Sequence, residues 1–228
     1  MISYKRIVYP IILIVFILPL SCFSQRILGG LSAGINLSQV DGDEIYGFHK
    51  IGFNGGPSVI IPFTKNKKWS VTLELLFSQK GSHQNVGPND TTGQPKPYYN
   101  LNLDYVEIPV LVHFTDKKII AGGVGFSYGQ LVNVKEVEHG VRIDSTTLSR
   151  PYNKNDISVL ADVRIRIWQR FWIDARYTYS IFKIRTRHFK NDYQEWNRNQ
   201  FNNLISIRFT YIFNEEVPGK NRKKSAEE

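Results

Sequence analysis

The chain has 228 residues, a formal net charge of +9 and a mean hydropathy of −0.27. A membrane-spanning helix needs about 20 apolar residues, and beyond its N-terminus the sequence has no such run. These properties exclude a protein with several membrane-spanning helices. They allow a membrane β-barrel, in which only every second residue must be apolar.

The N-terminal 24 residues have the three parts of a secretory signal. Lys5 and Arg6 give a charged start, Ile7–Leu20 is apolar, and small residues precede Gln25. We therefore predict a signal peptide over residues 1–24. An uncleaved helical anchor and lipidation of Cys22 are the alternatives. Cys22 is the only cysteine, so the cleaved chain would have no disulfide and no cysteine ligand.

Eight segments after this leader alternate between apolar and polar residues, as strands with one apolar face do. They are Ile27–Leu37, Gly52–Phe63, Trp69–Gln79, Leu103–Phe114, Ile119–Leu131, Ile157–Trp168, Trp172–Phe182 and Asn203–Phe213. In the hairpin of the fourth and fifth segments, Val106, Val110 and Phe114 share one face, and small residues such as Gly123 and Gly125 form another. A strand that crosses a bilayer at a tilt needs about 9–11 residues, which these segments supply.

The connections between these segments alternate in length. They are short after the second, fourth and sixth segments and long after the others. Outer-membrane barrels have short periplasmic turns and long outer loops. The sequence therefore predicts an all-β fold, an eight-stranded antiparallel up-and-down transmembrane β-barrel over residues 25–213. Residues 214–228 contain no apolar run and are predicted to be a disordered, charged periplasmic tail.

Charged residues on the inward face of these segments form the first candidate site. They are Glu74, Glu107, Asp162, Asp174, Arg164, Arg166, Arg176 and Arg208. A proton or ion path is one interpretation. Eight strands leave room only for side chains, however, and four acids would compensate four arginines. We therefore predict a structural charge network in the lumen. A three-residue turn after Trp168 would place Arg166 opposite Asp174.

The last long connection is both basic and aromatic. Its basic side chains are predicted to contact lipopolysaccharide phosphates at the outer rim. The alternative is a charged loop that only contacts solvent. The basic residues are Lys183, Arg185, Arg187, Lys190 and Arg198. Nucleic acid is not expected, because an exported protein seldom meets it. The acidic run at residues 41–44 lacks the spacing of a full calcium loop. No catalytic, zinc-binding or phosphate-binding motif stands out, so we predict no enzyme activity, metal or cofactor.

The fourth and fifth segments resemble the signature hairpin of PorT-like outer-membrane β-barrels. The matching residues are Tyr105, Glu107, Ile108, Pro109, Gly122 and Gly123, with Gly30, Gly34, Asn36 and Phe77–Gly81 in support. The resemblance spans about Gly29–Phe213 and implies an eight-stranded barrel in the outer membrane of a Gram-negative bacterium. It also implies a role in protein secretion. The chain departs from the family in its charged tail and in His113, where a lysine is common.

Three functions are compatible with these patterns. We favour a non-catalytic outer-membrane barrel that acts through its outer loops or as an accessory of a secretion or envelope machine. A small pore is the second. A soluble secreted ligand-binding barrel is the third, since alternation alone does not say which face is inside. The expected partners are outer-membrane lipid, lipopolysaccharide and secretion-machinery proteins, and the barrel is expected to be monomeric.

Overall fold

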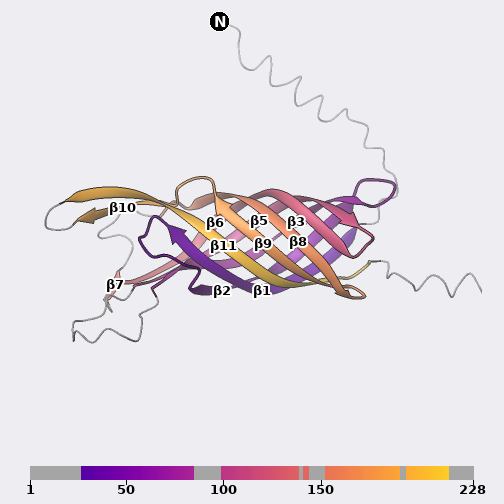
Figure 1. Cartoon of the computed structure of the whole chain (residues 1–228), viewed down its shortest axis with the longest axis horizontal. Coiled ribbons are helices and arrows are strands. Elements are labelled where there is room, and N and C mark those ends of the chain that lie inside the picture. The colour runs from indigo at the N-terminus through magenta and orange to yellow at the C-terminus, as the bar shows by residue number, and fades with distance from the viewer. Residues whose placement is uncertain (1–26, 85–98, 139–140, 144–151, 191–193, 216–228) are drawn as a thin grey trace, which may run out of the picture.

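The strands of the protein form one closed antiparallel sheet (Figure 1). The structure, a computed structural model, describes residues 27–84, 99–138, 141–143, 152–190 and 194–215. Its strands are β1 (Leu28–Asp41), β2 (Lys50–Pro62), β3 (Trp69–Glu74), β4 (Leu76–His83), β5 (Tyr99–Asp116), β6 (Ile120–Glu138), β7 (Val141–Ile143), β8 (Asn155–Trp168), β9 (Phe171–Ser180), β10 (Arg185–Lys190) and β11 (Glu195–Ile212). The described residues contain no helix that is long and apolar enough to cross a membrane.

Eight of these strands make the wall of the barrel, which confirms the predicted fold. β3 and β4 are two parts of one strand, interrupted at Leu75. Each wall strand pairs with its neighbour in the sequence, and β11 closes the ring by pairing with β1, where Gly34 lies opposite Arg208. β7 and β10 are short additional strands that pair with β6 and β11.

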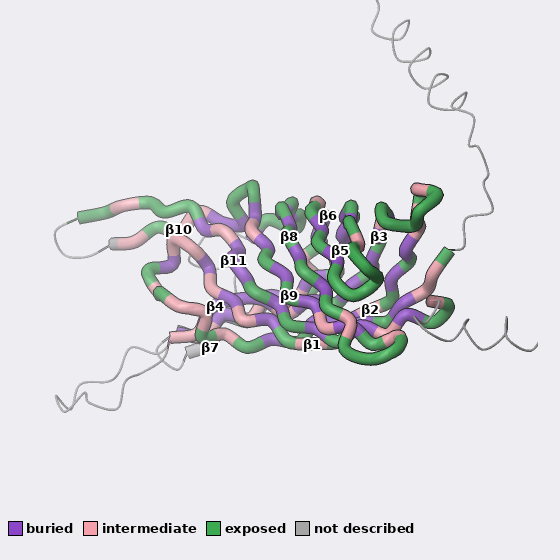
Figure 2. The backbone as a smooth tube through the Cα atoms, turned by 45° about the vertical axis from the view of Figure 1, so that its right-hand side comes forward, coloured by how far each residue is buried: buried purple, intermediate pink, exposed green. Residues whose placement is uncertain are grey.

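Buried and exposed residues alternate along the strands of the barrel wall (Figure 2). The exposed residues are largely apolar, and many of the buried ones are polar or charged. On β5, Val106, Val110 and Phe114 are exposed, whereas Glu107 and His113 between them are buried. A soluble barrel would have the opposite arrangement, because its apolar side chains must leave water. The outward apolar face therefore argues for lipid around the barrel and against the soluble ligand-binding alternative.

The narrow lumen depends on close approach of the backbones at small residues. Gly125 on β6 faces the backbone of β5, and a Cβ atom there would collide with the carbonyl oxygen of Val110. Gly122 on the same strand has open space around the position of a Cβ. Glycine is thus a packing requirement at Gly125 but not at Gly122.

The outer half of the barrel is longer than the alternation predicts. β5 has 18 residues, β6 has 19 and β11 has 18. The last long connection was predicted to be a loop, and this is wrong for most of its length. β10 pairs with the first part of β11 to form a two-stranded ribbon, which we call the outer ribbon. Figure 1 shows it projecting from the left end of the barrel. The stacked rings of Phe189 and Trp196, 5.6 Å apart, stabilise its tip.

The turn between β8 and β9 also differs from the prediction. A bulge between Arg166 and Trp168 shifts the register, so Trp168 pairs with Phe171 and stacks on its ring at 5.9 Å. The predicted three-residue turn, with Arg166 opposite Asp174, is therefore wrong. Arg164 lies opposite Asp174 instead. A bulge adds one residue to one strand and re-aims the side chains beyond it.

Candidate functional site

A cluster of ion pairs crosses the middle of the lumen. Glu74 on β3 accepts hydrogen bonds from Arg164 at 2.8 Å, from Arg176 at 2.7 and 2.9 Å, and from Arg208 at 3.1 Å. These arginines lie on β8, β9 and β11, on the other side of the ring from β3. A single carboxylate thus holds three guanidinium groups across the barrel.

Two aspartates complete this cluster. Asp162 accepts a hydrogen bond from Arg176 at 2.9 Å, and Asp174 accepts one from Arg208 at 3.2 Å. His113 Nε2 lies 2.8 Å from Asp162 Oδ1. We call the six charged residues the central charge cluster; its members are Glu74, Asp162, Asp174, Arg164, Arg176 and Arg208, all buried. Three carboxylates balance three arginines, and the group fills the lumen with side chains.

Glu107 and Arg166 were predicted to belong to the same network, but they lie apart from the central charge cluster. Glu107 lies nearer the outer end, where its Oε1 is 2.6 Å from Lys80 Nζ. Lys80 also contacts Asp156 at 3.2 Å, and Asn202 donates a hydrogen bond to Asp156 at 2.9 Å. Lys80 and Asp156 were not in the predicted network. Asp156 was missed because it lies at the predicted end of a loop.

Arg166 lies at the opposite end of the barrel, that of the short turns, which is predicted to be periplasmic. It forms an ion pair with Glu215, and its guanidinium lies 4.4 Å from the centre of the Trp172 ring. Trp172 Nε1 donates a hydrogen bond to Glu215 at 2.9 Å. Glu215 was assigned to a disordered tail, but it is held at the barrel mouth. Residues 216–228 and the predicted signal peptide, residues 1–24, lie outside the described part of the chain.

A further buried ion pair ties the outer ribbon to the barrel. Arg185 on β10 donates two hydrogen bonds to Glu136 on β6, at 2.9 and 3.1 Å, and Tyr99 donates a third at 2.8 Å. These residues lie beyond the exposed apolar band, which ends near Val106 on β5 and Val132 on β6. Burial alone would raise the pKa of Glu136, but the hydrogen bonds and charge of Arg185 hold this pKa below its ordinary value.

This pairing corrects part of the predicted lipopolysaccharide site. Arg185 is 2% exposed and occupied by Glu136, so it cannot contact a lipid phosphate. Arg187 lies over the buried Tyr99 ring at 5.1 Å. Lys183 and Arg198 are exposed, and Arg198 forms an ion pair with Glu44 at 3.3 Å. The side chain of Lys190 lies outside the described part of the structure.

The acidic run in the first outer loop is partly buried. Asp43 is 4% exposed and accepts a hydrogen bond from the Ile45 amide at 2.8 Å. Burial raises the pKa of Asp43 to about 6. Within the described ranges, no group of three or more His, Cys, Asp or Glu side chains could hold a metal ion. The geometry of Asp43 is therefore that of a loop anchor, not of a calcium ligand.

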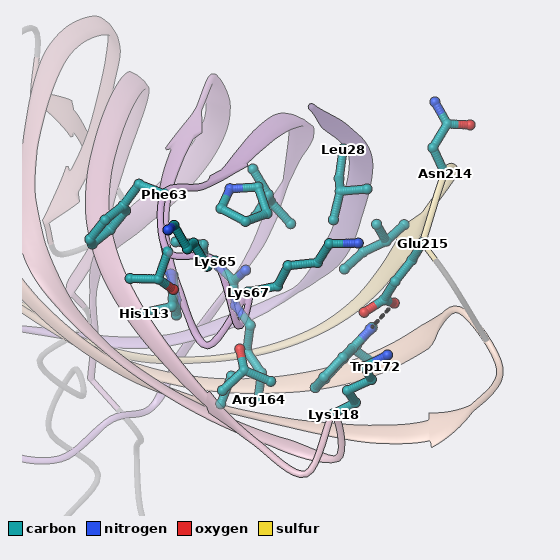
Figure 3. Close-up of a pocket in the computed structure, with 17 residues that line it drawn as sticks. Leu28, Phe63, Lys65, Lys67, His113, Lys118, Arg164, Trp172, Asn214 and Glu215 are labelled. Carbon is teal, nitrogen blue, oxygen red and sulfur yellow. Dashed lines mark hydrogen bonds between the residues drawn. The ribbon is translucent and has the colours of Figure 1, made fainter. Parts of the chain in front are cut away.

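The lumen is hollow at the end of the short turns, which is predicted to be periplasmic, in contrast to the filled middle. A cavity of about 600 Å³ opens there (Figure 3). Its apolar walls include Ile60, Trp172 and Ile212. Arg164 and His113, which belong to or contact the central charge cluster, lie at its inner end. The alternation predicted which residues face inward, but it gave no sign that this end is empty.

Several solved structures resemble the fold. The attachment invasion locus protein Ail of Yersinia pestis has 16% sequence identity and a TM-score of 0.46, and the alignment covers 82% of this chain and 98% of that one. Neisserial surface protein A (NspA) has 13% identity and a TM-score of 0.48, with 82% and 97% covered. No curated protein matches the sequence. Residues 23–185, however, match the family described as outer membrane protein beta-barrel domain, and together with the lipid-facing eight-stranded ring this match shows that the chain belongs to that family of outer-membrane proteins.

Proposed function

We propose that the protein is a non-catalytic, closed barrel in the outer membrane of a Gram-negative bacterium, and that it acts through its outer ribbon and loops. In this proposal the signal peptide is cleaved after export, and the barrel neither conducts solutes nor carries out a reaction. The central charge cluster is the observation that carries the proposal, because a conducting pore needs a continuous aqueous path through the lumen.

The cost of opening such a path supports a closed state. Glu74 is 3% exposed and Arg208 is fully buried. The two side chains contact each other across the lumen, and Arg208 also contacts Asp174. Separating one partner of a buried ion pair costs about 3–5 kcal/mol. A path through the middle would separate several such pairs at once, so open states would be rare.

The outer end supports a role in contacts outside the cell. β5, β6 and the outer ribbon extend past the apolar band, and their exposed side chains include Lys135, Lys183 and Arg198. Lys183 and Arg198 are the members of the predicted lipopolysaccharide site that remain available to phosphate groups. We retain them as proposed contacts, and we retain the secretion-accessory role that the PorT-like resemblance implies.

Conductance in planar lipid bilayers tests the closed state. The wild type should give no stable open events. Glu74→Ala with Arg208→Ala removes one carboxylate and one guanidinium from the lumen without changing the net charge, and should give brief openings. Glu44→Ala with Arg198→Ala is the matched control, since it removes an ion pair outside the lumen. Stable events of porin size from the wild type would overturn the proposal.

Crosslinking in intact cells tests the outer contacts. A photoreactive side chain at position 198 of the outer ribbon should capture lipopolysaccharide, whereas one at position 67 of a short periplasmic turn should not. Capture of secretion proteins from either position would support the accessory role. If neither lipopolysaccharide nor any envelope protein were captured at position 198, the proposed action through the outer ribbon would be refuted.

A further inference from the structure

We propose that the periplasmic cavity binds an anionic amphiphile with a single acyl chain. The inference is separate from the proposed function of the outer end, since it concerns the opposite mouth of the barrel. It rests on the shape of the cavity, on the chemistry of its walls and on the charge of its rim.

The cavity is closed at its inner end. Arg164 lines it and is held there by hydrogen bonds to Glu74 at 2.8 Å and to Asp162 at 3.4 Å. His113, which also lines it, is bonded to Asp162. These contacts belong to the wall of ion pairs across the lumen. A molecule that enters from the periplasm would therefore stay at this end of the barrel.

The walls of the cavity change from polar to apolar toward its mouth. Ile60, Ala121, Trp172 and Ile212 point inward, are each at most 6% exposed and form one apolar cluster, with Leu28 packed against it. The lumen of a membrane barrel is ordinarily polar, so an inward apolar ring around open space is unusual. Hydrocarbon that enters this ring would leave water and bury its apolar surface against these side chains.

The volume limits the size of the ligand. Small-molecule sites have volumes of about 300–1,000 Å³, and this cavity has about 600 Å³. At about 30 Å³ for a group the size of water, it holds one acyl chain of medium length with a small head group. A phospholipid with two long chains is too large.

The rim is cationic and sets the sign of the ligand charge. Lys65 and Lys67 reach the cavity from the turn between β2 and β3, and Lys118 reaches it from the turn between β5 and β6. In Figure 3 the Lys67 side chain extends into the opening. Among the described residues that line the cavity, Glu215 is the single carboxylate, and it also contacts Arg166 and Trp172. The described lining thus holds more cations than carboxylates, and this excess favours a carboxylate or phosphate head group.

Fluorescence quenching of Trp172 provides a local test. The other tryptophans, Trp69, Trp168 and Trp196, are replaced by phenylalanine, and the full chain is placed in lipid nanodiscs. The probes are 12-bromododecanoate, the neutral 12-bromododecan-1-ol, and a lysophosphatidylglycerol that carries the same brominated chain. Quenching by each anionic probe should saturate. Tighter binding of the dodecanoate would identify a free fatty acid as the natural ligand, and tighter binding of the lysophosphatidylglycerol would identify a lysophospholipid. Quenching by the alcohol to the same extent at the same concentration would show only partitioning and would overturn the proposal.

Two pairs of variants separate the cavity from the lipid and from general charge. Ala121→Phe fills the cavity and should abolish saturable quenching, whereas Gly122→Phe adds the same bulk to the lipid-facing side, where space is open. Charge reversal to glutamate at Lys65, Lys67 and Lys118 should weaken binding of both anions by about tenfold. The matched control is the same reversal at the exposed outer residues Lys135, Lys154 and Lys183.

The charge-reversal variants keep the test decisive if Ala121→Phe does not fold. Their substitutions lie on exposed turns, and folding is checked by heat-modifiable mobility in gels. Equal weakening by the periplasmic and the outer reversals would mean that total charge, not the cavity rim, attracts the probe. That result, or saturable quenching that survives Ala121→Phe in a folded barrel, would refute the site.

Discussion

Replacing Glu74 by glutamine tests whether the central charge cluster stabilises the closed barrel. Glu74→Gln keeps the shape of the side chain, so it creates no cavity. It removes the negative charge that faces Arg164, Arg176 and Arg208, which donate four hydrogen bonds to this carboxylate. The cluster then has three cations and two carboxylates, and one guanidinium charge is left buried without compensation.

The structure sets the size of the effect. An uncompensated partner of a buried ion pair costs about 3–5 kcal/mol, and Glu74 is 3% exposed, so solvent screens little of this loss. We therefore expect the free energy of unfolding to fall by about 3–5 kcal/mol. Glu44→Gln is the control, because its ion pair with Arg198 is exposed. That change should cost less than about 1 kcal/mol.

Urea unfolding of the barrel in lipid vesicles measures these differences. The double variant Glu74→Gln with Arg208→Met restores the balance of charge, so its loss should be smaller than the sum of the single losses by at least about 1 kcal/mol. A loss below about 1 kcal/mol for Glu74→Gln, together with additivity in the double variant, would refute the reasoning. The charges would then be hydrated in the lumen, and the argument for a closed barrel would fail with them.

Three further predictions concern other parts of the chain. Burial raises the pKa of Asp43 to about 6, so stability is lost as the pH rises through this value. Protection of the Ile45 amide from hydrogen exchange should fall by about tenfold from pH 5 to pH 7, but not in Asp43→Asn. Arg185→Met removes the ion-pair partner of the buried Glu136, and should make the outer ribbon sensitive to protease in intact cells while the urea midpoint of the barrel stays unchanged. Gly125→Val should lower the free energy of unfolding by about 1–3 kcal/mol in the same urea assay, because its Cβ meets the backbone of β5.

The alternation of apolar and polar residues was sufficient to predict the wall of the barrel. Each side chain on β5 faces the side that the pattern predicts, with Val110 outside and His113 inside. The number of alternating segments predicted the strand count, and the alternation of short and long connections predicted an outer-membrane barrel. These properties depend only on period and spacing, which the sequence carries directly.

The outer third of the barrel could not be predicted in this way. There the strands leave the membrane, and polar residues occur on both faces, as in the outer ribbon between Arg185 and Gln200. Outside the membrane no lipid contacts the strands, so the alternation of apolar and polar residues is not required there. The pair of Arg185 and Glu136 was therefore missed, since the two residues lie 49 positions apart and neither belongs to a periodic segment.

The error at the turn between β8 and β9 shows what alternation leaves undetermined and what the charges add. A shift of two residues leaves every side chain on its original face, so period-two patterning accepts both Arg164 and Arg166 as the partner of Asp174. Only one of these registers lets Arg164 reach Glu74 while Arg166 reaches Glu215. The other register would leave buried charges without these partners, at a cost of several kcal/mol. The apolar face therefore selects which side of each strand meets the lipid, and the ion pairs select among the registers that satisfy it.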